Sequence, residues 1–133
     1  MAGEADLSKL LASLAPVLDV REFAFCSVPD EEAALAPRVW ATVHEAEGMT
    51  LILEAGEARE RGFPVEATWA LVTLTVHSSL GAVGLLAAVS AALAAAGISV
   101  NAVSAYYHDH LFVPWEERRR ALSVLQRLSE ESP

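Results

Sequence analysis

The residues best suited to chemistry stand in the second half of the chain, where His108, Asp109 and His110 are consecutive. On a strand, the side chains of His108 and His110 would share one face, as two ligands of a metal ion do. A third ligand would have to come from His44, His77 or a distant carboxylate, and no sequence spacing predicts one. We therefore favour a hydrogen-bonded turn and strand pair over a metal centre, and we expect no metal ligands.

A different chemistry is indicated at residues 78–84, where an alternating apolar run meets an alanine-rich stretch with helical spacing. A strand that leads into a helix leaves backbone N–H groups unpaired at the positive end of the helix dipole, which favours a carboxylate. Gly81 and Gly84 would permit close approach of a ligand or, equally, tight packing of the helix on a sheet. The segment lacks the GxGxxG spacing and the lysine of a phosphate-binding loop, so nucleotide binding is not indicated.

The remaining polar residues give no sign of catalysis. Asn101 could hold the amino or carboxylate group of a ligand through its amide, or it could bond the backbone at the end of a strand. Glu45 and Glu47 flank a tight turn, where solvated acids are commoner than an acid–base pair. Ser78 follows His77, but adjacency does not create the geometry of an activated nucleophile. We expect no catalytic residues and no cofactor, and therefore no enzyme.

Composition and charge exclude several classes of partner. The chain has 133 residues, which is room for one compact domain or two half-domains, and 53% of them are hydrophobic. Its 18 acidic and 9 basic side chains give a formal charge of −9, which repels phosphate backbones and anionic lipid surfaces. The basic run 118–120 follows two glutamates and is expected to form a solvated, internally paired helix face. We expect neither nucleic-acid nor membrane binding.

Cysteine usage and the N-terminal segment predict the compartment. The single cysteine, Cys26, excludes an internal disulfide, and its alternating apolar surroundings favour a small buried hydrophobe over a reactive thiol. Glu4 and Asp6 precede a short apolar run, which is unlike a signal peptide. Residues 67–108 carry no charge, but serines and glycines interrupt them, which argues against a membrane span. These features predict a cytoplasmic protein, and the alanine-rich, lysine-poor composition indicates a bacterial source.

The first half of the sequence predicts one helix and a group of strands. Asp6 would cap a helix of regularly spaced leucines, which Pro16 ends. Alternating apolar residues bounded by turn signals predict three strands: 20–28, 39–44 and 49–53. The tight turn at 45–48 would join the last two strands in a hairpin. The polar, glycine-containing segment 55–66 is predicted to be a linker.

The second half predicts the order strand, helix, strand, strand, helix. The three strands are predicted at 68–76, at 98–105 and at a segment ending with Val113. A first helix at 81–96 would be capped by Ser78 or Ser79 and ended by Gly97, and Pro114 would begin a final helix. A parallel strand pair bridged by a helix, followed by a hairpin, defines a ferredoxin-like sheet with both helices on one side.

Each of the two helices has a predicted buried stripe. In the first helix the bulky residues of the stripe are Val83, Leu86, Val89 and Leu93. In the final helix the inward residues are Leu122, Leu125 and Leu128. The opposite face of the first helix consists of small apolar residues: Ala87, Ala91, Ala94 and Ala95. An uncharged alanine face is rarely left to water, so we expect it to pack against another unit.

Three runs of sequence resemble one family. They are Leu74-Thr-Val-His-Ser-Ser-Leu-Gly-Ala-Val-Gly-Leu85, Gly97-Ile-Ser-Val-Asn101 and Tyr106-Tyr-His-Asp-His-Leu-Phe-Val-Pro114. They are similar to ACT-domain proteins, and more narrowly to short, stand-alone bacterial ACT proteins related to the tandem ACT units of aspartate kinases and of eukaryotic arginine sensors. The earlier run Glu45-Ala-Glu-Gly-Met-Thr-Leu-Ile-Leu53 also fits this group.

The resemblance implies an α+β, ferredoxin-like ACT fold with two ACT-like halves, at residues 1–63 and 64–133. The C-terminal half reads βαββα and lacks the fourth strand of the family's plan, so we expect the strand at 20–28 to take its place. ACT domains pair side by side and hold an amino acid near the loop between the first strand and the first helix. Carried onto this chain, that loop is His77, Ser78, Ser79, Leu80, Gly81, Ala82, Val83 and Gly84. The facing strand is 98–101, which places Asn101 beside the loop. Independently of the resemblance, Asp109 is a candidate to bind the cationic group of a ligand.

The function that follows is a regulatory sensor that binds an amino acid or a similar small ligand and works as a homodimer. Two other functions remain open on the sequence. One is a small metal-dependent hydrolase that uses His108, Asp109 and His110. The other is an assembly module without a ligand, which would use its alanine face to bind a partner.

Overall fold

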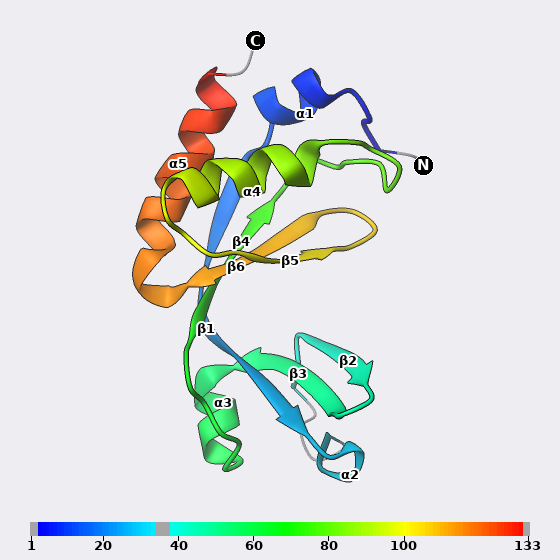
Figure 1. Ribbon diagram of the computed structural model, residues 1–133, viewed down its shortest axis with the longest axis vertical. Coiled ribbons are helices and arrows are strands. Elements are labelled where there is room, and N and C mark those ends of the chain that lie inside the picture. The colour runs from blue at the N-terminus through cyan, green and yellow to red at the C-terminus, as the bar shows by residue number, and fades with distance from the viewer. Residues whose placement is uncertain (1–2, 34–37, 132–133) are drawn as a thin grey trace. The chain divides into compact units, whose positions relative to one another are not determined.

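The structure is a computed structural model, and it describes residues 3–33 and 38–131 (Figure 1). The chain forms two compact units. Unit 1 combines the chain up to Val20 with the chain from Ala70 onward, and unit 2 is Arg21–Trp69. Residues 3–20 therefore pack with the C-terminal segments. The two packing units do not coincide with the predicted ACT-like halves at 1–63 and 64–133. That these halves are two ACT-like repeats stays a prediction.

Unit 2 is built on a three-stranded antiparallel arrangement in the order β2-β3-β1. Its strands are β1 (Pro16–Val28), of which the later part lies in this unit, β2 (Ala41–Glu45) and β3 (Gly48–Glu54). Glu45 pairs with Gly48 across a two-residue turn, and Val28 pairs with Met49. The predicted hairpin is therefore confirmed. Gly48 has φ +152 and faces the Val28 carbonyl, so a side chain there would be strained.

The predicted linker at 55–66 is wrong for its first half. Residues Ala55–Glu60 form helix α3, because Ala55 and Ala58 bury their side chains against the strands. Gly56 disfavours a helix by about 1 kcal/mol relative to alanine, but burial of the two alanines outweighs its effect. The helix ends at Glu60 and is followed by Gly62, whose φ is +76, and the N–H of Phe63 donates to the Ala58 carbonyl at 2.9 Å. This is a glycine-ended helix, a signal that the sequence contained.

The core of unit 2 contains Cys26, which is 3% exposed. Its buried residues are Ala24, Cys26, Val28, Met49, Leu51, Leu53, Ala55, Ala58 and Phe63. The Cys26 thiol donates to the Pro64 carbonyl at 3.4 Å, and burial raises its pKa. The prediction of a small buried hydrophobe at this position is confirmed. A short helix, α2 (Asp30–Ala33), follows β1 in this unit.

Unit 1 has the strand order β1-β4-β6-β5, and the first residues of β1 belong to it. Its elements are α1 (Leu7–Ala12), β4 (Trp69–Leu74), α4 (Leu85–Ala95), β5 (Asn101–Ser104), β6 (Asp109–Pro114), η1 (Trp115–Glu117) and α5 (Arg118–Glu131). The chain order β4-α4-β5-β6-α5 is completed by β1 at the place of a fourth strand. The part of β1 in this unit is Pro16–Val20, so the expectation that residues 20–28 fill this place is corrected: Phe23–Val28 pair with β3 in unit 2. The residues just after β4 also pair with those just before β1: the N–H groups of Thr75 and Val76 donate to the carbonyls of Ala15 and Leu14. The predicted ferredoxin-like α+β fold is confirmed.

Helices α1, α4 and α5 pack on one another and, with the sheet, enclose the core of unit 1 (Figure 1). Asp6 caps α1 as predicted, because its carboxylate accepts from the Lys9 N–H at 3.1 Å. In α5, Leu125 is fully buried together with Ala121, while Leu122 and Leu128 are partly buried against the same core. None of the helices in the described ranges has the length and apolar character needed to cross a bilayer.

Helix α4 begins four residues later than predicted, at Leu85 instead of Gly81. Gly84 is its N-terminal boundary and has φ +95, a left-handed conformation that interrupts the helix before Leu85. Neither Ser78 nor Ser79 caps it. The buried stripe changes accordingly to Leu85, Val89 and Leu93. Two residues of the predicted stripe are instead exposed, Val83 at 82% and Leu86 at 39%.

Candidate functional site

A cavity of about 210 Å³ lies in unit 1 between the loop after β4, the start of α4 and the β5–β6 hairpin. Its lining residues are Ser78, Ser79, Leu80, Ala82, Leu85, Leu86, Ser104, Ala105 and Asp109. Drug-sized ligands occupy pockets of roughly 300–1,000 Å³, so this cavity suits a smaller molecule. We call it the junction cavity, because the β4-to-α4 junction supplies most of its wall.

The junction cavity brings together half of the residues that the sequence singled out. Five of them line it: Ser78, Ser79, Leu80, Ala82 and Asp109. Five others do not: His77, Gly81, Val83, Gly84 and Asn101. In the antiparallel register, Ser104 pairs with Asp109, whereas Asn101 lies at the other end of β5 and pairs with Phe112. Sequence reasoning therefore missed Ser104, and the hairpin register was the signal that could have found it.

Asp109 supplies the only charge in the wall of the junction cavity. It is 8% exposed, and it is the only charged residue found buried in the described part of the chain. The Ser104 hydroxyl donates to Oδ1 at 2.5 Å, and the Ser78 hydroxyl donates to Oδ2 at 3.3 Å. Burial of a carboxylate is costly unless hydrogen bonds replace its water, and these two hydroxyls provide that replacement. Each oxygen has a further lone pair with which to accept from a ligand.

Several backbone N–H groups of the loop already donate hydrogen bonds to other atoms of the protein. The Ser79 N–H donates to the Glu4 carbonyl at 2.8 Å, and the Ala82 N–H donates to the Ser79 carbonyl at 3.0 Å. The Gly81 N–H donates to the Ser79 hydroxyl at 3.1 Å. At the start of α4, by contrast, no side chain from the described residues caps the helix. The first turn of α4, with Leu85 and Leu86 in the cavity wall, therefore presents the positive end of the helix dipole.

The two histidines beside Asp109 serve other contacts. His110 Nδ1 lies 3.0 Å from the Thr73 hydroxyl, and burial, followed by the nearby His108, lowers the pKa of His110. The rings of His108 and His110 are 6.2 Å apart in an edge-to-face arrangement. Across residues 3–33 and 38–131, no three His, Cys, Asp or Glu side chains are grouped so that they could hold a metal ion. The donor set for a metal-dependent hydrolase is thus not assembled among these residues.

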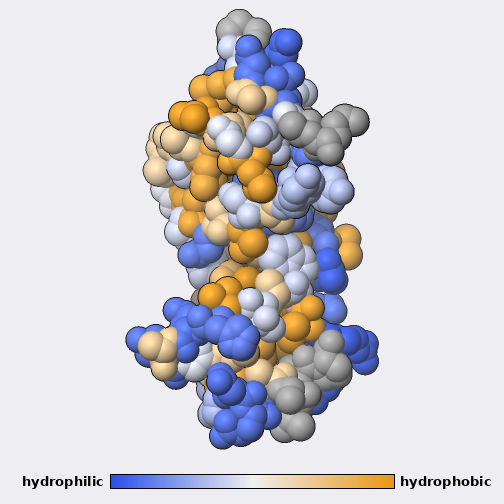
Figure 2. Space-filling view, turned by 90° about the vertical axis from the view of Figure 1, so that its right-hand side faces the viewer, coloured by the Kyte–Doolittle hydropathy of each residue, from blue (hydrophilic) through white to orange (hydrophobic). Residues whose placement is uncertain are grey.

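Exposed apolar and aromatic side chains stand next to the junction cavity. Leu80, in its wall, is 67% exposed. Tyr106 and Tyr107, which follow the lining residue Ala105, are 56% and 60% exposed and stack edge-to-face at 4.9 Å. The Tyr107 ring also lies 5.2 Å from that of His77. Figure 2 shows hydrophobic side chains gathered on the surface of the upper part of the molecule, on the side toward which this loop and hairpin point in Figure 1.

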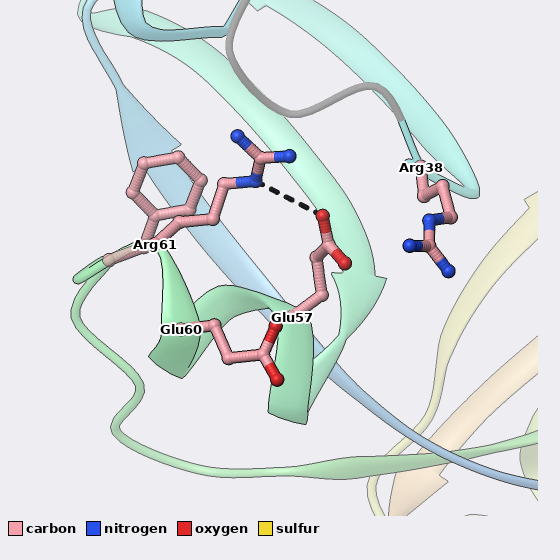
Figure 3. Close-up of a pocket in the computed structure, with 5 residues that line it drawn as sticks. Arg38, Glu57, Glu60 and Arg61 are labelled. Carbon is pink, nitrogen blue, oxygen red and sulfur yellow. Dashed lines mark hydrogen bonds and ion pairs between the residues drawn. The ribbon is translucent and has the colours of Figure 1, made fainter.

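A second cavity, of about 360 Å³, lies in unit 2 and is lined by charged side chains around α3. Its lining residues are Arg38, Glu57, Glu60, Arg61 and Phe63. Arg61 Nε lies 3.0 Å from Glu57 Oε1, one helical turn away. Figure 3 shows this ion pair, with Glu60 on the same helix and Arg38 set apart from them. Exposed ion pairs of this kind contribute about 0–1 kcal/mol, because water and salt screen them.

The fold defines the class of the protein: an α+β chain built on a ferredoxin-like unit. Family models described as ACT domain match residues 2–70 and 65–127. The chain therefore belongs to the ACT-domain family, and the resemblance inferred from sequence is confirmed.

Solved structures show the same architecture. A Vibrio cholerae protein described as of unknown function and a possible transport protein is 42% identical, with 92% of this chain and 95% of that chain covered and a TM-score of 0.84. The ligand-free regulatory subunit of aspartate kinase from Thermus thermophilus is 12% identical over 87% of this chain and 97% of that chain, with a TM-score of 0.67.

Aspartokinase III from E. coli, in complex with aspartate and ADP, is 16% identical over 88% of this chain and 33% of that chain, with a TM-score of 0.62. At such low identity the likeness to the two kinase chains is one of fold. No curated protein matches the sequence. The family models and these neighbours together show an ACT-domain fold.

Proposed function

We propose that the protein is a non-catalytic sensor that binds a small amino acid in the junction cavity. The observation that carries this proposal is that one cavity is lined both by a buried carboxylate and by the first residues of a helix without a side-chain cap. The buried Asp109 carboxylate attracts an ammonium group, and the uncapped first turn of α4 attracts a carboxylate. A free amino acid carries both groups, and a volume of about 210 Å³ suits a short side chain.

The contacts around Asp109 support binding over catalysis. Both of its oxygens accept hydrogen bonds from serine hydroxyls, which hold the side chain in one orientation. His110, adjacent to Asp109 in the sequence, has its Nδ1 3.0 Å from the Thr73 hydroxyl. A ligand that binds one arrangement of the loop and hairpin better than another shifts the population toward it, and that shift is the output of a sensor.

A thermal-shift screen of the amino acids tests the proposal. A ligand at 100 times its dissociation constant stabilises the folded state by about 2.7 kcal/mol, so binding is readily detected. The critical comparison is alanine against ethylamine and propionate, each of which has only one of the two charged groups. We expect stabilisation by the zwitterion and little by either fragment. A flat response to the whole panel at millimolar concentration would contradict the proposal.

The Asp109→Asn variant localises the binding. Loss of the buried charge removes the counter-ion of the ammonium group, so we expect affinity to fall at least about tenfold, typical of a charged hydrogen bond. Glu60→Gln, which removes an exposed carboxylate in unit 2, is the matched control and should leave affinity unchanged. Equal affinity in both variants would place the ligand elsewhere.

The proposal extends to the assembly and the compartment: a homodimer in the cytoplasm, supported by one buried cysteine without a disulfide and an exposed apolar helix face.

A ligand-free assembly module is a second candidate function, and the same exposed face of α4 favours it. Ala87, Ala91, Ala94 and Ala95 are all exposed on α4. Light scattering of Ala91→Glu distinguishes the roles: a folded variant with the wild-type mass would show that this face is not an interface.

A further inference from the structure

The first residues of the described chain lie along the loop of the junction cavity. Glu4 and Ser78 form a parallel β-bridge. The Glu4 N–H donates to the His77 carbonyl at 2.9 Å, and the Ser79 N–H donates to the Glu4 carbonyl at 2.8 Å. We call residues 3–7 the N-terminal strap. Through these two hydrogen bonds, the strap holds the backbone on both sides of Ser78, a lining residue that also donates to Asp109.

The fit between the strap and the loop leaves no free space at its first residue. A Cβ on Gly3 would lie 2.6 Å from the His77 carbonyl oxygen and 2.7 Å from the Ser78 carbonyl carbon. Real side chains do not approach backbone atoms this closely, so only glycine fits here without displacement. At the other end of the strap, a Leu7 methyl lies 3.2 Å from the position of a Cβ on Gly84, where α4 begins. The strap thus contacts both ends of the loop.

The strap is itself anchored to the body of unit 1. The Glu4 carboxylate accepts from the N–H groups of Ala5 and Asp6, both at 3.0 Å, which fixes the turn into α1. Asp6 caps α1, and Leu10 of that helix is completely buried in the core. The strap therefore connects the loop to α1, in addition to the hydrogen bonds within the loop and the contact of Ser78 with Asp109.

We propose that Gly3 and Glu4 are positioning residues of the junction cavity. This inference rests on the proposed function. Without the strap, the His77 carbonyl and the Ser79 N–H would face water, and the loop would gain conformational freedom. A ligand would then have to order the loop on binding, and that entropy would be subtracted from its affinity. With the strap in place, the serines and Asp109 are already arranged.

The test compares two glycine-to-alanine variants. Gly3→Ala places a methyl group against the His77 backbone, whereas Gly56→Ala in α3 meets nothing within 4 Å and serves as the control. Amide hydrogen exchange at Ser79, followed by NMR without ligand, should be at least about tenfold faster in Gly3→Ala, because local opening controls exchange. The affinity for the amino acid found by the thermal-shift screen should fall about five- to fiftyfold. The control should change neither quantity by more than about twofold.

Glu4→Pro gives an independent variant, since it removes the N–H that donates to His77 and leaves the carbonyl that accepts from Ser79. It should show the same two effects. Unchanged exchange at Ser79 in both variants overturns the positioning role, and so does faster exchange with unchanged affinity; in both cases the proposed function still stands. If the wild type binds no amino acid, the proposed function fails and the positioning role falls with it, whatever the exchange rates show.

Discussion

Two cavities, one in each unit, contain charge in opposite ways. The junction cavity of unit 1 has one charged side chain among its described lining residues, Asp109, which is buried and hydrogen-bonded by two hydroxyls. The cavity around α3 in unit 2 has four charged side chains, of which Arg61 and Glu57 pair with each other. The number of charges is thus a poor guide to a binding site. A carboxylate attracts a ligand strongly when water is excluded from it and when its hydrogen-bond donors within the protein leave a lone pair free.

The physical basis of this difference is the local dielectric. Two unit charges 4 Å apart interact by about 1 kcal/mol in water and by about 4 kcal/mol at the effective dielectric near a protein surface. At 8% exposure, Asp109 is more shielded from water than the ion pair of unit 2, whose Arg61 and Glu57 side chains are 32% and 14% exposed. Substitutions test this contrast, with expected stability losses from several kcal/mol down to a few tenths.

The largest loss of stability is expected from truncating a residue that belongs to both the junction cavity and the core. Leu85, 4% exposed, forms both the cavity wall and the core, so Leu85→Ala should lower the free energy of unfolding by about 2–5 kcal/mol. Leu86→Ala, at a neighbouring lining position that is 39% exposed, should lower it by less than about 1 kcal/mol. Urea denaturation measures both. Equal losses would contradict the start of α4 at Leu85.

The next effect separates the buried acid from an exposed one. Asp109→Asn weakens two charge-assisted hydrogen bonds in a buried place and should lower the free energy of unfolding by about 1–3 kcal/mol. Glu60→Gln should stay within about 0.5 kcal/mol of the wild type, as exposed substitutions do. A stability loss of similar size in both variants would remove the contrast between the two cavities.

A pH-dependent effect is expected from His110. Burial, followed by His108, lowers its pKa from the ordinary 6.5, while Asp109 opposes the shift. Below pH 6.5 the unfolded chain therefore binds a proton that the folded state does not take up until lower pH. The contribution of this residue is fully present above that pH and is lost as the pH falls. Denaturation curves of His110→Gln should lack this part of the acid-side decline; an unchanged pH profile would contradict it.

The smallest effect is expected in the cavity of unit 2. Glu57→Gln breaks the ion pair with Arg61 on α3 and should lower the free energy of unfolding by about 0.3–0.5 kcal/mol at low salt. Because salt screens the pair, the difference from the wild type should fade in high salt. A loss above about 2 kcal/mol that persists in salt would show that these charges are desolvated, in the manner of Asp109.

Local patterns in the sequence predicted most of the elements. The alternation around the turn at 45–48 predicted the β2–β3 hairpin, and Asp6 predicted the start of α1. Two elements were misjudged because local composition and tertiary packing disagree. The polar segment after β3 forms α3 because its two alanines reach the core. The start of α4 depends on the left-handed backbone of Gly84, and glycine adopts right- and left-handed conformations about equally readily.

The class of fold could be predicted from the sequence alone, because hydrophobic periodicity and turn residues are local properties that favour the same secondary structure in nearly any context. It also singled out Asp109 and the serine loop after β4 as neighbours of one site. Only the tertiary structure decided which of those residues share a wall. The register of β5 against β6 placed Ser104, and not Asn101, beside Asp109. Residues 77–79 lie against Gly3 and Glu4, more than seventy positions earlier in the chain. Contacts over such separations depend on how whole elements pack, and a local pattern carries no record of them.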